Sequence, residues 1–322
     1  MSLTRKMMTA GTVVGGVLGT LAVFNKMTES MAGELDTVLS GEERRYPWKY
    51  GDIFYKVKGS SSAKPLVLLH GFGPGASSYE WRKNVDLLSE HFRVFVIDLL
   101  GFGLSDHPAI EYTAETFTDL IHDFLKEVVA KPALVVAHGL TCAYVIACAY
   151  RRPQLFERLV LVAPPPTILQ EVSSDLIDTI WKRTLLIPIV GQFVYNLLIS
   201  RQAIRSYYDQ QGYDNPGFIT DELVEYTYTS AHQRNSRYPM ASLLSNSLTA
   251  DVHEPLARLQ MPVVAIWGRE DQCMPSEIST VFKKVNPRTD IHILDKGSYQ
   301  VQEEQATSFN HLVSEFASAA VG

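Results

Sequence analysis

The chain has 322 residues, of which 46% are hydrophobic and 20% charged, and its 29 basic and 35 acidic residues give a formal net charge of −6. This composition excludes a disordered or collagen-like chain and supplies enough apolar side chains for a sizeable core. The acidic balance and the absence of long basic runs argue against a nucleic-acid partner.

The first uncharged segment of the chain covers residues 7–25. As a helix these 19 residues would extend about 28 Å, close to the thickness of a bilayer core, so we predict a membrane anchor. Arg5 and Lys6 precede the segment and favour a cytoplasmic N-terminus, whereas Lys26 on the far side opposes it. A signal peptide cleaved near residues 30–32 and a helix lying along the membrane interface are the alternatives.

Short apolar runs with helix-like segments between them dominate the rest of the chain. An alternating run over residues 50–57 predicts a half-buried antiparallel strand, and the later runs are apolar throughout, as in parallel strands buried on both faces. Those later runs are 65–70, 93–98, 133–137, 159–163, 262–267 and a last strand at 290–294; the helix-like segments are 79–88, 113–129, 141–150 and 305–319. The alternation predicts a doubly wound, mostly parallel α/β sheet.

One long interval, residues 164–259, contains no strand-like run and is predicted to be a helical cap inserted into the sheet domain. Its segment 185–199 is too apolar for a solvent-facing helix. Packing against the main sheet is the plain interpretation; the alternatives are the wall of a pocket for an apolar ligand and a membrane-facing lip. The predicted organisation is an anchor at 1–28, a linker at 29–45, a core formed by 46–163 and 260–322, and the cap.

Glycine-rich turns follow several of the predicted strands. The motifs are His70-Gly71-Phe72-Gly73, DLLGFGLSD at 98–106, VAHGLT at 136–141, IWGREDQCMP at 266–275 and LDKGSYQVQEE at 294–304. Their order and spacing over residues 46–319 resemble the α/β-hydrolase family of esterases and lipases. The resemblance implies the α/β-hydrolase fold with a crevice at the carboxyl ends of the strands.

That family uses a serine on a sharp turn, a histidine that takes its proton and an acid that orients the histidine. The resemblance places Gly139 at the nucleophile position, Asp271 at the acid position and Ser298 at the base position. Two of the three groups are therefore predicted to be lost. Because removing the serine or the histidine alone costs about 10⁶ in turnover, ordinary esterase catalysis is not expected.

Three other residues near the predicted crevice are candidate substitutes or parts of the binding loop. Cys142 begins the helix after the turn, where it is either a small core residue or an alternative nucleophile. His138 precedes the vacated position on a strand, and alternation predicts that it points away from the crevice and is structural. His70 is either a structural turn residue or part of the oxyanion loop.

The binding architecture is expected to persist. The resemblance implies that the N–H groups of Phe72 and Leu140 converge as an oxyanion hole, with His70 and Gly71 in the same binding loop. We predict a membrane-anchored pseudoenzyme that binds a hydrophobic small molecule or a membrane protein. The alternative is an active esterase, lipase, lyase or cyclase that uses other groups. No cofactor and no metal are predicted, because nucleotide-binding motifs and metal-ligand spacings are missing from the sequence.

Overall fold

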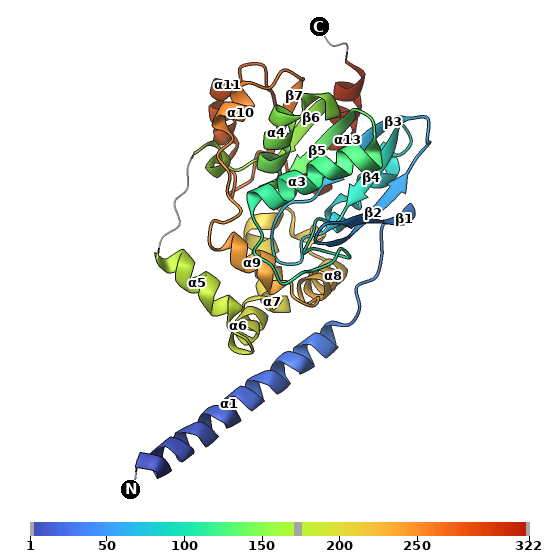
Figure 1. Ribbon diagram of the computed structural model, residues 1–322. Coiled ribbons are helices and arrows are strands. Elements are labelled where there is room, and N and C mark those ends of the chain that lie inside the picture. The colour runs from blue at the N-terminus through green and yellow to red at the C-terminus, as the bar shows by residue number, and fades with distance from the viewer. Residues whose placement is uncertain (1–2, 171–175, 320–322) are drawn as a thin grey trace.

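An eight-stranded sheet forms the centre of the computed structural model, which describes residues 3–170 and 176–319, with side chains from residue 15 onward (Figure 1). The order is β1-β2-β4-β3-β5-β6-β7-β8; β2 pairs antiparallel with β1 and β4, and the other pairings are parallel. The strands are β1 (Glu42–Trp48), β2 (Gly51–Lys58), β3 (Lys64–Leu69), β4 (Phe92–Ile97), β5 (Ala133–His138), β6 (Phe156–Val162), β7 (Val263–Gly268) and β8 (Asp290–Leu294). The predicted doubly wound sheet is confirmed.

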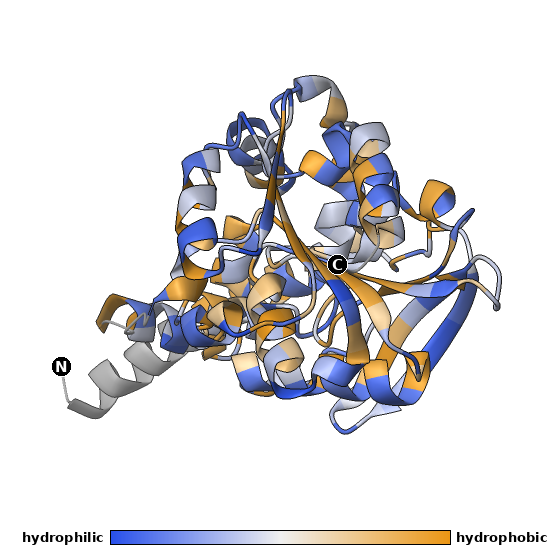
Figure 2. Ribbon diagram, turned by 90° about the horizontal axis from the view of Figure 1, so that it is seen from above, coloured by the Kyte–Doolittle hydropathy of each residue, from blue (hydrophilic) through white to orange (hydrophobic). Residues whose placement is uncertain are grey.

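Helices cover both faces of the sheet, so the parallel strands are apolar on both sides (Figure 2). In β3, Val67 and Leu69 belong to one core layer, while Leu66 and Leu68 belong to the other. The first layer includes helices α3 (Ala114–Phe124), α4 (Thr141–Arg151) and α11 (Ser279–Val285), and the second includes α2 (Val85–Leu88) and α13 (Ala306–Ser318).

Two elements differ from the sequence prediction. Strand β1 begins in the predicted linker and ends in the predicted core; it is an edge strand with four charged residues, so it lacks the apolar signal of a buried strand. The helix predicted at 79–88 is two short pieces, η1 (Ser78–Trp81) and α2, and the one predicted at 113–129 is α3 followed by the π-helical turn η2 (Leu125–Val129).

Helices joined by turns and loops make up the described part of the cap region, and no strand lies in it. Its helices are α5 (Leu176–Leu186), α6 (Val190–Leu198), α7 (Arg201–Tyr207), α8 (Asp221–Ala231), α9 (Arg237–Leu243) and α10 (His253–Ala257). Leu185, Tyr195 and Ile199 pack with residues of α8 and α9 into a hydrophobic core that lies mostly within the cap. This core is separate from the two core layers on the sheet. The expected packing of segment 185–199 against the main sheet is therefore wrong.

Helix α1 (Leu3–Ala32) extends away from the body of the protein and contacts it through its C-terminal part (Figure 1). The Phe24 and Phe193 rings meet edge to face with centroids 5.2 Å apart, and the Asn25 amide donates to the carbonyl of Ile189 at 2.8 Å. The predicted anchor starts outside the residues whose side chains are described. Within the described part of the chain, no helix has the length and hydropathy needed to cross a membrane.

Candidate functional site

The sharp turn between β5 and α4 places Gly139 at the carboxyl edge of the sheet. Gly139 has a φ of +56°, in the left-handed region that glycine adopts without strain. Its N–H donates to the carbonyl of Val162 at 2.8 Å, which ties the turn to β6. The chain thus keeps a sharp strand-to-helix turn, and the residue at its apex has no side chain.

Tyr299 occupies the space beside Gly139. A Cβ atom added to Gly139 would lie 2.3 Å from the Tyr299 hydroxyl oxygen, far inside van der Waals contact. This hydroxyl has no hydrogen-bond partner among the described residues. Burial raises the pKa of Tyr299 well above its ordinary value, so the phenol is a protonated donor. A phenol oxygen therefore fills the volume that a nucleophilic side chain would need.

Asp271 lies in the loop after β7 and is 3% exposed. Its Oδ1 accepts hydrogen bonds from the backbone N–H groups of Cys273 at 2.9 Å and Met274 at 2.8 Å. Its Oδ2 is buried and has no partner among the described residues. Burial raises the pKa of Asp271, and the two backbone bonds oppose that rise. When the histidine that such an acid orients is replaced, one carboxylate oxygen of the acid loses its hydrogen-bond partner. The unpartnered Oδ2 of Asp271 fits this situation.

Ser298 is buried, and neither of its hydrogen bonds is to Asp271. Its hydroxyl donates to the carbonyl of Gln211 at 3.3 Å, and its N–H donates to the Glu304 carboxylate at 2.7 Å. Gly139, Asp271 and Ser298 therefore form no nucleophile–base pair.

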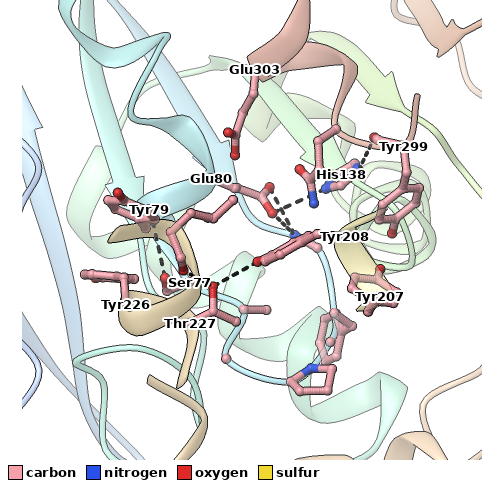
Figure 3. Close-up of a pocket in the computed structure, with 18 of the residues that line it drawn as sticks. Ser77, Tyr79, Glu80, His138, Tyr207, Tyr208, Tyr226, Thr227, Tyr299 and Glu303 are labelled. Carbon is pink, nitrogen blue, oxygen red and sulfur yellow. Dashed lines mark hydrogen bonds and ion pairs between the residues drawn. The ribbon is translucent and has the colours of Figure 1, made fainter. Parts of the chain in front are cut away.

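His138 is the main correction to the sequence analysis, because it lines the recess at this edge of the sheet and does not point away (Figure 3). Its Nδ1 lies 3.3 Å from the Glu80 carboxylate and its Nε2 lies 3.1 Å from the carbonyl of Tyr299. Burial lowers the pKa of His138, but the charge and hydrogen bond of Glu80, the hydrogen bond to the Tyr299 carbonyl and the charge of Asp271 together outweigh burial, and the net shift is upward. Two acceptors and a raised pKa define a buried imidazolium.

Glu80 and a second buried ion pair were missed by the sequence analysis. The Glu80 carboxylate also accepts from the N–H of Gly71 at 3.2 Å. Arg82 pairs with Glu303 at 2.5 Å, and Tyr213 donates to the same carboxylate at 2.8 Å. The available signal was the pair of charged residues, Glu80 and Arg82, that flank Trp81 in the segment 79–88, which is predicted to be helical.

Five tyrosines and these charged groups surround the recess, whose empty volume, including its open mouth, is about 520 Å³ (Figure 3). The tyrosines are Tyr79, Tyr207, Tyr208, Tyr226 and Tyr299. Gly71 and Phe72 line the recess, whereas Leu140 is not part of the lining. The N–H groups of Phe72 and Leu140 have no hydrogen-bond partners within the described residues. Free donors therefore persist at the predicted oxyanion position.

His70 does not line the recess, which corrects its placement in the binding loop. Its Nδ1 lies 2.7 Å from the carbonyl of Gly71, and its Nε2 accepts from the N–H of Leu99 at 2.9 Å. Both ring nitrogens are thus used to fix the turn after β3.

One hydroxyl–imidazole pair exists among the described residues, and it lies between the core and the cap. The Ser236 hydroxyl is 3.0 Å from Nδ1 of His107, whose Nε2 lies 3.1 Å from the carbonyl of Gly103. Burial lowers the pKa of His107, which favours the neutral ring, and Nδ1 competes with the carbonyl of Ser230, 3.4 Å from the Ser236 hydroxyl, for the serine proton. Ser236 is 6% exposed.

Cys142 is fully buried, and its thiol donates to the carbonyl of Ala137 at 3.2 Å. Burial raises its pKa strongly, which favours the core interpretation over a nucleophile. Cys148 is also buried, whereas Cys273 is partly exposed.

We expect a thiol reagent such as DTNB to titrate one cysteine, Cys273, in the native protein and three in guanidinium chloride. A second fast-reacting thiol that disappears in Cys142→Ala would contradict this assignment.

The Arg82–Glu303 pair predicts a pH dependence of stability. Burial raises the pKa of Glu303 to about 6, and Arg82 only partly offsets it. Because the folded-state pKa is above the unfolded value of about 4.5, ionisation destabilises the fold, and the contribution of Glu303 decreases as pH rises from about 4.5 to 6. In urea unfolding, the free energy of unfolding of the wild type should decrease by about 2 kcal/mol relative to that of Glu303→Gln over this pH range. A constant difference between the two proteins would contradict the shift.

Comparison with known proteins identifies the family. The family model described as the alpha/beta hydrolase fold matches residues 64–304, and the chain belongs to this family. A 2-hydroxy-6-oxo-2,4-heptadienoate hydrolase from Pseudomonas putida strain F1 is 24% identical over 277 residues, which cover 84% of this chain and 94% of that protein. A 2-hydroxymuconate semialdehyde hydrolase from Pseudomonas sp. strain CF600 is 25% identical over 269 residues, with 81% and 89% covered.

Solved structures show the same similarity. The meta-cleavage product hydrolase from Pseudomonas fluorescens IP01, in a mutant complexed with acetates, matches with a TM-score of 0.69 and 25% identity. The match covers 85% of this chain and 96% of that one. Relatives of this chain are thus meta-cleavage product hydrolases with the α/β-hydrolase fold.

Proposed function

We propose that the recess beside Tyr299 binds an apolar small molecule through a carbonyl or carboxylate oxygen and does not cleave it by a serine mechanism. The observation that carries the proposal is the protonated, unpartnered Tyr299 hydroxyl in the space of the missing nucleophile. The free N–H of Phe72 supplies a second donor at the recess. Backbone and phenol donors favour an oxygen that carries partial or full negative charge.

The chemistry of the relatives supports an oxygen ligand of this kind. The names of the two Pseudomonas enzymes describe an oxo-dienoate and a muconate semialdehyde, which contain carbonyl and carboxylate groups. The related solved structure holds acetates. In this chain the charges of Glu80 and Glu303 are balanced by His138 and Arg82, so a ligand carboxylate meets no unpaired acid there.

Calorimetric titration with octanoate tests the proposal. Wild type should bind octanoate, and Tyr299→Phe should weaken binding about tenfold or more, because one hydrogen bond to a charged group contributes about 1.5–3 kcal/mol. Tyr150→Phe, on the exposed surface of α4, is the matched control and should bind as wild type does. Equal affinity in Tyr299→Phe and wild type would contradict the proposal.

An active hydrolase that uses other groups is the second candidate, favoured by the Ser236–His107 hydrogen bond. In that mechanism Ser236 would attack and His107 would accept its proton, with the carbonyl of Gly103 orienting the ring. Incubation with a fluorophosphonate probe and a panel of p-nitrophenyl esters separates the candidates. Labelling that is lost in Ser236→Ala would establish this second function, and absence of labelling and turnover supports the first.

A further inference from the structure

Exposed large hydrophobic side chains gather on one part of the protein. Twelve of the nineteen found among the described residues lie on α1, α5, α6 and the connection from α5 to α6. They are Val17, Val23, Phe24, Met27, Met31, Leu176, Ile177, Ile180, Trp181, Ile187, Leu197 and Leu198, here called the apolar surface. Such a concentration is unusual for a surface that faces water alone.

The elements that carry the apolar surface pack side by side. Phe24 contacts Phe193 of α6, and the Asn196 amide of α6 donates to Asn25 of α1 at 3.1 Å. Helix α6 in turn packs beside α5 (Figure 1). The three helices therefore form one continuous part of the molecule at the end far from α11.

These same segments are basic in an acidic protein. Residues 3–32 contain three basic residues and one acidic residue, and residues 176–198 contain two and one. Together they carry a formal charge of +3, which leaves −9 on the rest of the chain. Lys182 pairs with Glu111 across the surface, but Lys26 and Arg183 have no ionic partner among the described residues. Apolar side chains combined with local positive charge match an anionic lipid surface.

We infer that the apolar surface docks this protein onto anionic lipid bilayers, with α5 and α6 lying at the interface beside α1. Trp181, 43% exposed on α5, is the type of residue that settles at the headgroup level. The exposed apolar side chains enter the outer acyl region while Lys26 and Arg183 stay near the lipid phosphates. This inference is independent of the ligand proposed for the recess.

Trp181 provides a built-in probe, because the other three tryptophans, Trp48, Trp81 and Trp267, are buried. The full chain is titrated with vesicles of phosphatidylcholine alone and of phosphatidylcholine with phosphatidylglycerol. We expect a blue shift and protection from acrylamide, with about tenfold tighter binding to the anionic vesicles that added salt weakens. Trp181→Phe should bind without the fluorescence change.

The double variant Ile177→Asp/Ile180→Asp tests the surface itself. Both side chains are more than half exposed, so the fold should be kept, and vesicle binding should fall about tenfold or more because two charges would enter the interface. Val281→Asp on α11, 42% exposed at the opposite end of the molecule, is the matched control and should bind as wild type does (Figure 1).

Three results would overturn the inference. The first is a lack of binding to anionic vesicles, and the second is equal binding by wild type and the double variant, which would assign attachment to α1 alone. The third is a wild-type dimer in light scattering that the double variant dissociates without any change in vesicle binding, which would assign the apolar surface to a second copy of the chain.

Discussion

Ester hydrolysis should appear in the triple variant Gly139→Ser/Ser298→His/Tyr299→Phe and not in Gly139→Ser alone. The single variant meets two obstacles: a side chain at a φ of +56° is strained, and its Cβ would lie 2.3 Å from the Tyr299 hydroxyl. Tyr299→Phe removes that oxygen, and Ser298→His supplies a base for the free Oδ2 of Asp271. We expect p-nitrophenyl butyrate turnover to rise at least about 10²-fold over wild type, the lower end of what a positioned base contributes.

The control keeps the two supporting changes and replaces the new hydroxyl: Gly139→Ala/Ser298→His/Tyr299→Phe should be inactive and unlabelled by fluorophosphonate. Gly139→Ser alone should also unfold about 1–3 kcal/mol more easily than wild type, because of strain at the turn. Full activity of this single variant would mean that a base already stands near the turn. An inactive but folded triple variant would contradict the assignment of Ser298 to the base position.

The sheet could be predicted because its signals are local in the chain. Buried parallel strands such as β3 and β5 are continuous apolar runs, and the glycine turns that follow them are short motifs. The turn at Gly139 was recognisable for the same reason. Strand β1 could not be predicted from such a signal. Because much of this edge strand is exposed, its sequence does not need apolar residues at regular intervals.

The contacts that define the recess could not be predicted, since each joins distant parts of the chain. Glu80 lies 58 residues from His138, and Tyr299 comes from the loop after β8 to meet Gly139. Alternation along β5 also failed for His138, because it is the last residue of the strand and ends at the crevice edge. Side-chain direction within a strand says little about a residue at its open end.

Tyr299 belongs to the altered site together with Gly139 and Ser298. The hydroxyl of Tyr299 would collide with any side chain at position 139, so the glycine and the tyrosine are sterically complementary. A phenylalanine at 299 would leave a void beside Gly139. The site is therefore repacked around the missing nucleophile, which fits a binding recess better than a catalytic turn that has lost one atom.

Glu80→Ala should destabilise the protein by about 3–5 kcal/mol at pH 5, because it leaves a buried imidazolium and the N–H of Gly71 without a partner. Since Glu80 raises the pKa of His138, the pair stabilises the fold below the unfolded histidine pKa of about 6.5, and this stabilisation is lost as pH rises through the folded pKa. The loss of unfolding free energy in Glu80→Ala should therefore be smaller at pH 8.5 than at pH 5. Glu80→Gln, which keeps the acceptor for Gly71 and can donate to a neutral His138, is the matched control with a smaller deficit. Urea unfolding of the three proteins at both pH values measures the effect, and a pH-independent deficit would show that His138 is neutral in the fold.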